Sequence, residues 1–340
     1  MSDYGSKVAD KAISATEKKI RRLYQQAAKE LKQKMVSFNE KFKKEQETML
    51  KRLEAGELTE AQYGEWLRRK VFVGRQWAQK VDQATRIMHD ANVEAALLVK
   101  KGKLNVFAEN YNYTAYELEK KAHGLVNFNI YNEESVEKLI RKKPKMLPEW
   151  KIDEKKDYKW NRQKVENSIT QGIIQGKRID EIADDLVKNL CTMNDNKMRM
   201  FARTGITGAQ NAGRQAQMED AEDMGIKVKK KWVATLDNRT RDAHQDLDGQ
   251  TKDIDEKFEV DWNGEHYELD FPGDPNGEPE MVYNCRCAMV EIYEGIDRKT
   301  VRRAYYDEDD EEYEEGKRKS YTVKDMTYNE WKKWKEGRKK

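Results

Sequence analysis

His244, Cys285 and Cys287 have the residue types and the spacing of a metal site. Residues two apart in a strand point to the same face, so both sulfurs could converge on one ion. A structural zinc ion takes four ligands, commonly Cys and His. Besides water, candidates for the fourth ligand are Asp246, Asp248 and His266. The two cysteines also fit a buried pair of thiols or a cross-link, and the sequence leaves all three interpretations open.

A dense polar loop, predicted from Leu236 to Gln250, holds a second candidate cluster. His244, flanked by carboxylates, could act as a general base, and the loop's arginines could hold a phosphate. Alternatively, the polar side chains satisfy one another and the loop backbone. We favour this structural interpretation, because a motif does not by itself supply a reaction. The predicted network consists of Arg203, Asp237, Arg239, Thr240, Arg241 and Asp248.

Two strands and a long helix are expected to position these residues. Residues 226–235 and 281–290 are strand-like, and the dipeptide Asn263-Gly264 predicts a hairpin around it. Helical periodicity runs from Met198 to about Met224 and should end at Gly225. The predicted fold class is α+β, with a long helical N-terminal half followed by a mixed domain of helices and a small antiparallel sheet.

The first half of the chain has the pattern of long helices, and no proline precedes Pro144. Apolar residues at helical spacing from Ile13 to Leu53 predict one helix of about 50 residues. A second stripe runs from Trp66 to Leu98, and a shorter helix is expected at 113–121. Between the stripes, Gly56 is a stop signal, and Thr59 with Gln62 fits a capping box.

These helices could form a hairpin whose apolar faces meet each other, or an arm that packs on partner subunits. A long helix with one narrow stripe cannot bury all of its surface in a small domain. We therefore expect the arm.

Composition and charge exclude several classes of protein. The 66 basic and 63 acidic residues give a net charge of +3, which divides into +9 for residues 1–150 and −6 for the rest. The longest purely apolar run, residues 95–99, is too short for a membrane helix. Three cysteines make no disulfide framework and suit a reducing compartment. We expect a protein made inside a cell, without a membrane partner.

The charged, proline-containing stretch 141–148 reads as a linker. The predicted domains are a long-helix arm at 1–145, a mixed domain at 150–295 with its core at about 185–295, and a charged tail at 296–340. The acidic block at 307–315 predicts partial disorder in that tail. Trp331 and Trp334 would share a helix face and dock the tail onto the body or a partner.

Four motifs in this order resemble one known family. They are "ARTGITGAQNAGR" (202–214), "KKWVATLDNRTRDAHQDLDGQ" (230–250), "FPGDP" (271–275) and "NCRC" (284–287). Together they closely resemble the Mu F-like, or head-morphogenesis, domain of tailed-phage minor head proteins. The resemblance covers about residues 185–295.

The resemblance implies a low-copy protein of the phage head, at or near the portal vertex, assembled in the host cytoplasm. The implied partners are the portal protein, then scaffold or major capsid protein. Separately, the basic balance of the first-half helices allows non-specific contact with packaged DNA. By this resemblance, some relatives carry Cys-x-x-Cys where this chain has Arg241 and His244, so the candidate metal ligands depart from theirs. The alternative functions are a metal- or His-dependent hydrolase, such as a nuclease, and a DNA-binding protein delivered with the genome.

Overall fold

The structure, a computed structural model, describes residues 3–36, 40–72, 75–122, 126–148, 152–175, 177–293, 303–305, 319–321 and 327–337. Two compact units emerge, each assembled from separate stretches of sequence. We call Ala15–Leu98 with Trp150–Met200 the helical unit. Met1–Ser14, Val99–Glu149 and Phe201–Lys340 form the sheet unit. The two units interleave along the chain, whereas the predicted domains follow one another. The predicted domain boundaries therefore stay a prediction.

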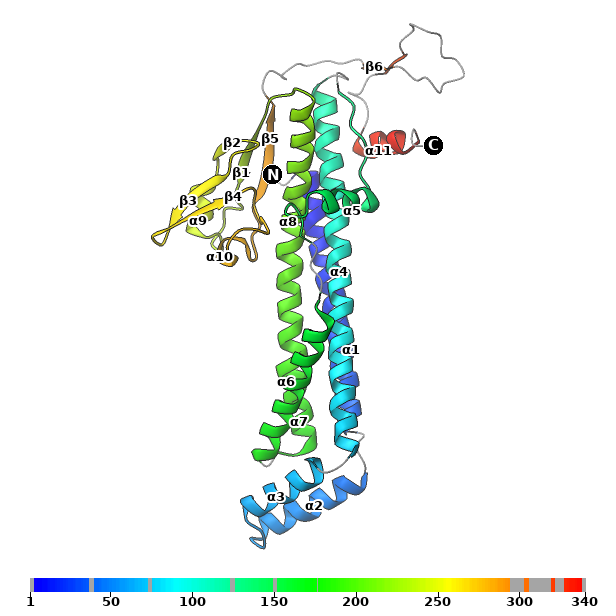
Figure 1. The fold of residues 1–340 in the computed structure, drawn as a ribbon, viewed down its shortest axis with the longest axis vertical. Helices are drawn as coiled ribbons and strands as arrows, with labels where there is room; N and C mark the ends of the chain where they lie inside the picture. Colours follow the sequence, from blue (N-terminus) through cyan, green and yellow to red (C-terminus); the bar gives the residue numbers. More distant parts are fainter. Residues whose placement is uncertain are drawn as a thin grey trace. The chain divides into compact units, whose positions relative to one another are not determined.

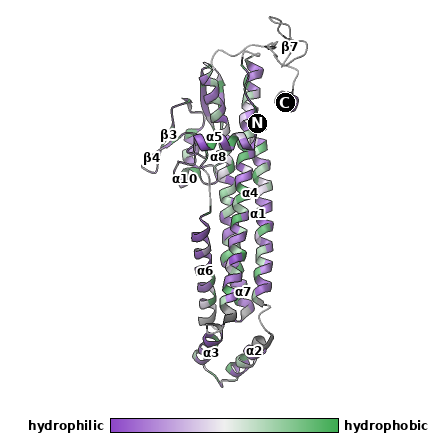
Figure 2. Ribbon diagram, turned by 45° about the vertical axis from the view of Figure 1, so that its right-hand side comes forward, coloured by the Kyte–Doolittle hydropathy of each residue, from purple (hydrophilic) through white to green (hydrophobic). Residues whose placement is uncertain are grey.

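In the helical unit, parts of α1 (Tyr4–Val36) and α4 (Arg75–Lys121) lie antiparallel. Tyr24 donates to the Asn92 side chain at 2.6 Å, and Lys80 donates to the carbonyl of Lys34 at 2.8 Å. Figure 2 shows hydrophobic and hydrophilic residues alternating along both helices, as one apolar stripe requires. The unit's other elements are α2 (Glu40–Glu54), α3 (Glu60–Phe72), α6 (Glu154–Ile174), α7 (Ile179–Leu186), a π-helix (Val187–Thr192) and the start of α8 (Met193–Asp223).

The helix-start signal before α3 is confirmed. The backbone N–H of Gln62 donates to Thr59 Oγ1 at 3.2 Å, and the Thr59 N–H donates to the Gln62 side chain at 2.9 Å. Two helices, α1 and α2, stand where the stripe predicts one, and residues 37–39 between them lie outside the described residues. The separate helix expected at 113–121 is wrong. It is the end of α4, because no proline precedes it and Gly102 alone does not stop a helix.

The sheet unit contains a three-stranded antiparallel sheet in the order β2-β1-β5, beside α8 (Figure 1). Strands β3 and β4 form a hairpin, and β6 pairs with β7. The sheet confirms the predicted α+β fold. The unit's elements, besides parts of α1, α4 and α8, are α5 (Glu133–Lys142), β1 (Val228–Val233), α9 (Asp242–Leu247), β2 (Thr251–Asp253), β3 (Phe258–Trp262), β4 (Glu265–Leu269), α10 (Pro279–Val282), β5 (Ala288–Tyr293), β6 (Arg303–Tyr305), β7 (Lys319–Tyr321) and α11 (Tyr328–Gly337).

Local turn chemistry sets several of these boundaries. The β3–β4 turn has positive φ at Asn263 (53°) and Gly264 (83°), as a two-residue hairpin turn of type I′ requires. Helix α8 ends before Gly225, whose φ is 84°. The strand expected over 281–290 is wrong in its first part, where α10 and a turn precede β5. Pro279 starts that helix, and Asn284 has a φ of 56°, which strands do not accommodate.

Helix α11 docks on the sheet unit, so the expected docking of the tail tryptophans is confirmed for Trp331. This side chain is fully buried, and its Nε1 donates to Glu119 at 2.6 Å. Lys335 also donates to the buried Glu119 carboxylate, at 2.7 Å. The acidic block 307–315 lies outside the described residues. No helix in the described part of the chain is long and apolar enough to cross a membrane.

Candidate functional site

His244, Cys285 and Cys287 come together in the sheet unit. Cys287 Sγ lies 3.4 Å and Cys285 Sγ lies 3.9 Å from His244 Nδ1. Each of the three side chains is no more than 3% exposed, and their ligand atoms all lie within 4.8 Å of one another. The sequence prediction of their convergence is confirmed, although the cysteines lie in the turn before β5 rather than in a strand.

Helix α9 positions His244, so the expectation of an unstructured polar loop there is wrong. Its ring packs edge-on against the buried Trp232 of β1, with centroids 5.8 Å apart. His244 Nε2 lies 2.9 Å from the carbonyl oxygen of Met281. A carbonyl can only accept, so Nε2 carries a proton. Nδ1 faces the two sulfurs.

The two thiols differ in their proton affinity. The hydrogen bond with Cys285 lowers the pKa of the Cys287 thiol, against the effect of burial, and His244 lowers it further. The same hydrogen bond and burial raise the pKa of Cys285. Both cysteines are free thiols in the structure.

Asp237 forms the best-made contact of the predicted loop network. Arg286 donates to both of its carboxylate oxygens at 2.6 Å, a bidentate ion pair. The backbone N–H of Arg239 donates to the same carboxylate at 2.9 Å, and Thr240 lies 3.3 Å from it. The bonds from Arg286 and then Arg239 hold the pKa of Asp237 far below its usual value. The sequence interpretation missed Arg286, although it lies between the two cysteines.

The other predicted network residues make separate contacts. Arg241 donates to the carbonyl of Tyr283 at 2.6 Å, and Arg203 donates to Asn284 at 3.1 Å. Asp248 accepts from the backbone N–H of Ala234 at 2.8 Å. These bonds fix α9 and the turn before β5 to their neighbours. Among the described residues, none of the three candidate fourth ligands joins the metal cluster: Asp246, Asp248 and His266.

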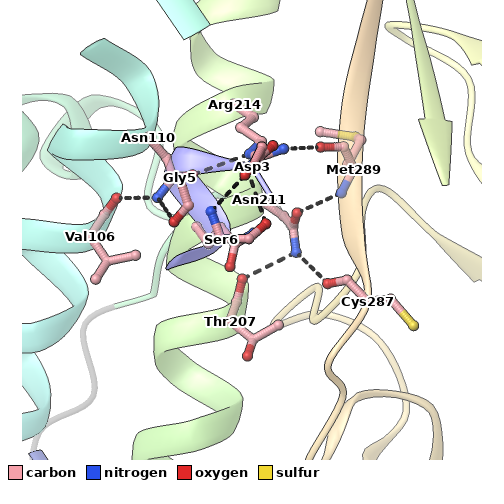
Figure 3. Close-up of polar contacts among 11 residues, drawn as sticks. Asp3, Gly5, Ser6, Val106, Asn110, Thr207, Asn211, Arg214, Cys287 and Met289 are labelled. Atoms are coloured by element: carbon pink, nitrogen blue, oxygen red, sulfur yellow. Dashed lines mark hydrogen bonds and ion pairs between the residues drawn. The ribbon is translucent and has the colours of Figure 1, made fainter. Parts of the chain in front are cut away.

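Asn211 of α8 supports the cysteine turn and was missed by sequence reasoning. Its fully buried amide donates to the carbonyls of Pro272 at 2.8 Å and Cys287 at 3.2 Å. Its oxygen accepts from the backbone N–H of Met289 at 2.8 Å (Figure 3). One side chain thereby joins α8, the "FPGDP" loop and the start of β5.

Arg214, one turn along α8, is also buried and was also missed. It donates to the carbonyl of Met289 at 2.6 Å, to Asn110 of α4 at 3.1 Å and to Asp3 at 2.8 Å (Figure 3). The available signal was helical spacing, since Arg214 lies three positions after Asn211 and seven before Ala221. Both of those residues are fully buried.

The chain is similar in sequence to several known proteins. Residues 163–290 match the family model described as phage Mu protein F like protein. The minor head protein GP7 of Bacillus phage SPP1 is 26% identical over 97% of this chain and 96% of its own length. The chain is thus similar to phage minor head proteins.

Shorter matches occur in other proteins. The NAD(+)–arginine ADP-ribosyltransferase EFV of Enterococcus faecalis is 35% identical over 134 residues, 39% of this chain and 26% of that protein. The uncharacterized protein YqbB of Bacillus subtilis is 30% identical over 130 residues, 41% of its length. The matched part of this chain therefore spans less than half the length of either relative. No solved structure matches the chain.

Proposed function

We propose that this protein is a phage minor head protein that acts in head morphogenesis by binding the portal protein at or near the portal vertex. The observation that carries the proposal is the similarity to a minor head protein over nearly the whole length of both chains. The virion head is then its place of residence, after assembly in the host cytoplasm. Scaffold or major capsid protein is a further partner of the same assembly.

A groove in the helical unit suits a partner helix of the portal protein. It lies between α1 and α4 and has a volume of about 550 Å³. Its α1 side carries Lys19, Arg22 and Glu30, and its α4 side carries Asp90 and Glu94. An amphipathic helix with charges of both signs beside its apolar stripe complements such a groove. Between these edges the groove is lined by Leu23, Ala27, Ile87, Ala91 and Leu98.

Co-expression of the full chain with the portal protein of its phage, followed by affinity capture, tests the proposal. The groove variant carries Asp90→Lys and Glu94→Lys. The matched control carries Glu222→Lys and Asp223→Lys, which make the same change of charge at the exposed end of α8. We expect the wild type and the control to capture the portal protein and the groove variant to lose it. Failure of the wild type to capture it would contradict portal binding. Equal capture by both variants would contradict the groove.

DNA contact is a second part of the proposal. The exposed residues Lys18, Lys19, Arg21 and Arg22 lie on α1 of the helical unit and could meet packaged DNA. We expect weak, sequence-independent binding that falls steeply with salt. Binding that is unchanged when these four residues become Gln would contradict this contact.

The geometry gives the hydrolase alternative no support. His244 is 2% exposed, and its two ring nitrogens face the Met281 carbonyl and the cysteine sulfurs. A general base needs to reach the proton that it removes from a substrate or water. We therefore propose a structural component of the head rather than an enzyme.

A further inference from the structure

We propose that His244, Cys285 and Cys287 bind one zinc ion, which fastens α9 to the turn before β5. The ion is structural, since the three side chains are buried and belong to elements that pack on the sheet. This inference is independent of portal binding.

The spacing of the donor atoms suits zinc. With the usual Zn–S and Zn–N bond lengths, a sulfur and a nitrogen on one tetrahedral ion lie about 3.6 Å apart. The two sulfurs lie 3.4 and 3.9 Å from His244 Nδ1, on either side of that value. Small shifts of the side chains would therefore complete the coordination without moving the backbone elements.

The groups around the donors also suit a metal ion. A zinc-bound histidine usually donates its other N–H to a carbonyl or carboxylate, as His244 does to Met281. The backbone N–H of Cys287 lies 3.4 Å from Cys285 Sγ and can donate to a thiolate there. Two thiolates and a neutral imidazole would balance the charge of the ion.

The fourth position of the tetrahedron would be filled by a water molecule. Among the described acidic and histidine side chains, the metal cluster contains only His244 with the two cysteines. A zinc ion with three protein ligands and one water is typical of catalytic sites. Burial of this cluster separates the ion from substrates, so a structural role follows.

Metal analysis of the full chain tests the proposal. The chain is purified under reducing conditions without chelator, and its zinc content is measured by mass spectrometry. Cobalt(II) titration of the chelator-treated wild type then reports sulfur ligation through sulfur-to-cobalt charge-transfer absorption. We expect one ion per chain. His244→Ala, Cys285→Ser and Cys287→Ser should each lose it, and His244→Cys should retain it.

Cys191→Ser is the matched control. Cys191 is a buried thiol in the helical unit, 3.4 Å from Met88 Sδ, and should not affect metal content. A wild type that binds neither zinc nor cobalt would overturn the proposal. Counting its thiols after unfolding would then distinguish a buried thiol pair from a cross-link between Cys285 and Cys287. Three free thiols would indicate a buried thiol pair, and one would indicate a cross-link. Metal that persists in all three alanine and serine variants would also overturn it.

Discussion

Removal of the Asn211 side chain should destabilise the sheet unit strongly. Asn211→Ala leaves the N–H of Met289 and the carbonyl of Pro272 without the amide, which now bonds each at 2.8 Å. The amide is fully buried, so water cannot simply take over its hydrogen bonds. An unsatisfied buried group costs about 1–3 kcal/mol, so two give a loss of about 2–6 kcal/mol. That is a large part of the roughly 5–15 kcal/mol that stabilises a typical domain.

Urea unfolding of the full chain, with hydrogen exchange measured in β5, is the assay. Exchange distinguishes loss at this site from unfolding of the helical unit. Asn196→Ala is the control, because Asn196 is exposed on the same helix and should change stability by less than about 0.5 kcal/mol. If Asn211→Ala also shifts stability by less than that and β5 stays protected, the reasoning from buried hydrogen bonds is refuted.

Three further predictions concern stability. Gly208→Ala should destabilise the protein by about 1–3 kcal/mol, since the added carbon would lie 2.5 Å from a backbone carbonyl oxygen. Gly64→Ala has open space and should stabilise the protein by up to about 1 kcal/mol. Urea unfolding measures both, and shifts of the same sign would contradict this prediction. Burial alone would raise the pKa of Asp3, but the Arg214 guanidinium and the hydrogen bonds from Arg214 and Ser6 lower this pKa overall. The Asp3 carboxylate therefore stabilises the fold above the usual pKa of aspartate, and this stabilisation is lost as the pH falls. The stability difference between wild type and Asp3→Asn should therefore shrink between about pH 6 and pH 2, and a constant difference would exclude this linkage. Lys335→Met leaves the buried Glu119 carboxylate without its cation, at a cost of about 3–5 kcal/mol. Helix α11 should then detach and be cleaved faster by proteases. Unchanged proteolysis would argue against this prediction.

Features that depend on a few neighbouring residues could be predicted from the sequence. The capping box of Thr59 and Gln62, the turn at Asn263-Gly264 and the helix end at Gly225 are set by local backbone chemistry. The long helices followed from the spacing of apolar residues. The convergence of His244 with Cys285 and Cys287 followed from residue type and separation, although the expected strand was wrong.

Features that depend on distant contacts could not be predicted. Asp237 and Arg286 are 49 positions apart, and Asn211 and Met289 are 78 apart. Either member of each pair, taken alone, has an ordinary solvent-facing interpretation. The boundary of α10 was missed because apolar residues of a short helix and of a strand look alike over so few positions.

The interleaving of the two units has a consequence for synthesis of the chain. Ser6 and Asp3 emerge from the ribosome early, yet their partner Arg214 and its acceptor on Met289 emerge some 200 residues or more later. At typical translation rates of about 5–20 residues per second, that wait lasts roughly 10 to 60 seconds. During this time the first turn of α1 lacks its native neighbours, so the sheet unit can finish folding only after β5 has been synthesised. Translation speed and chaperone supply should therefore influence the yield of folded protein more than they would for two domains arranged one after the other.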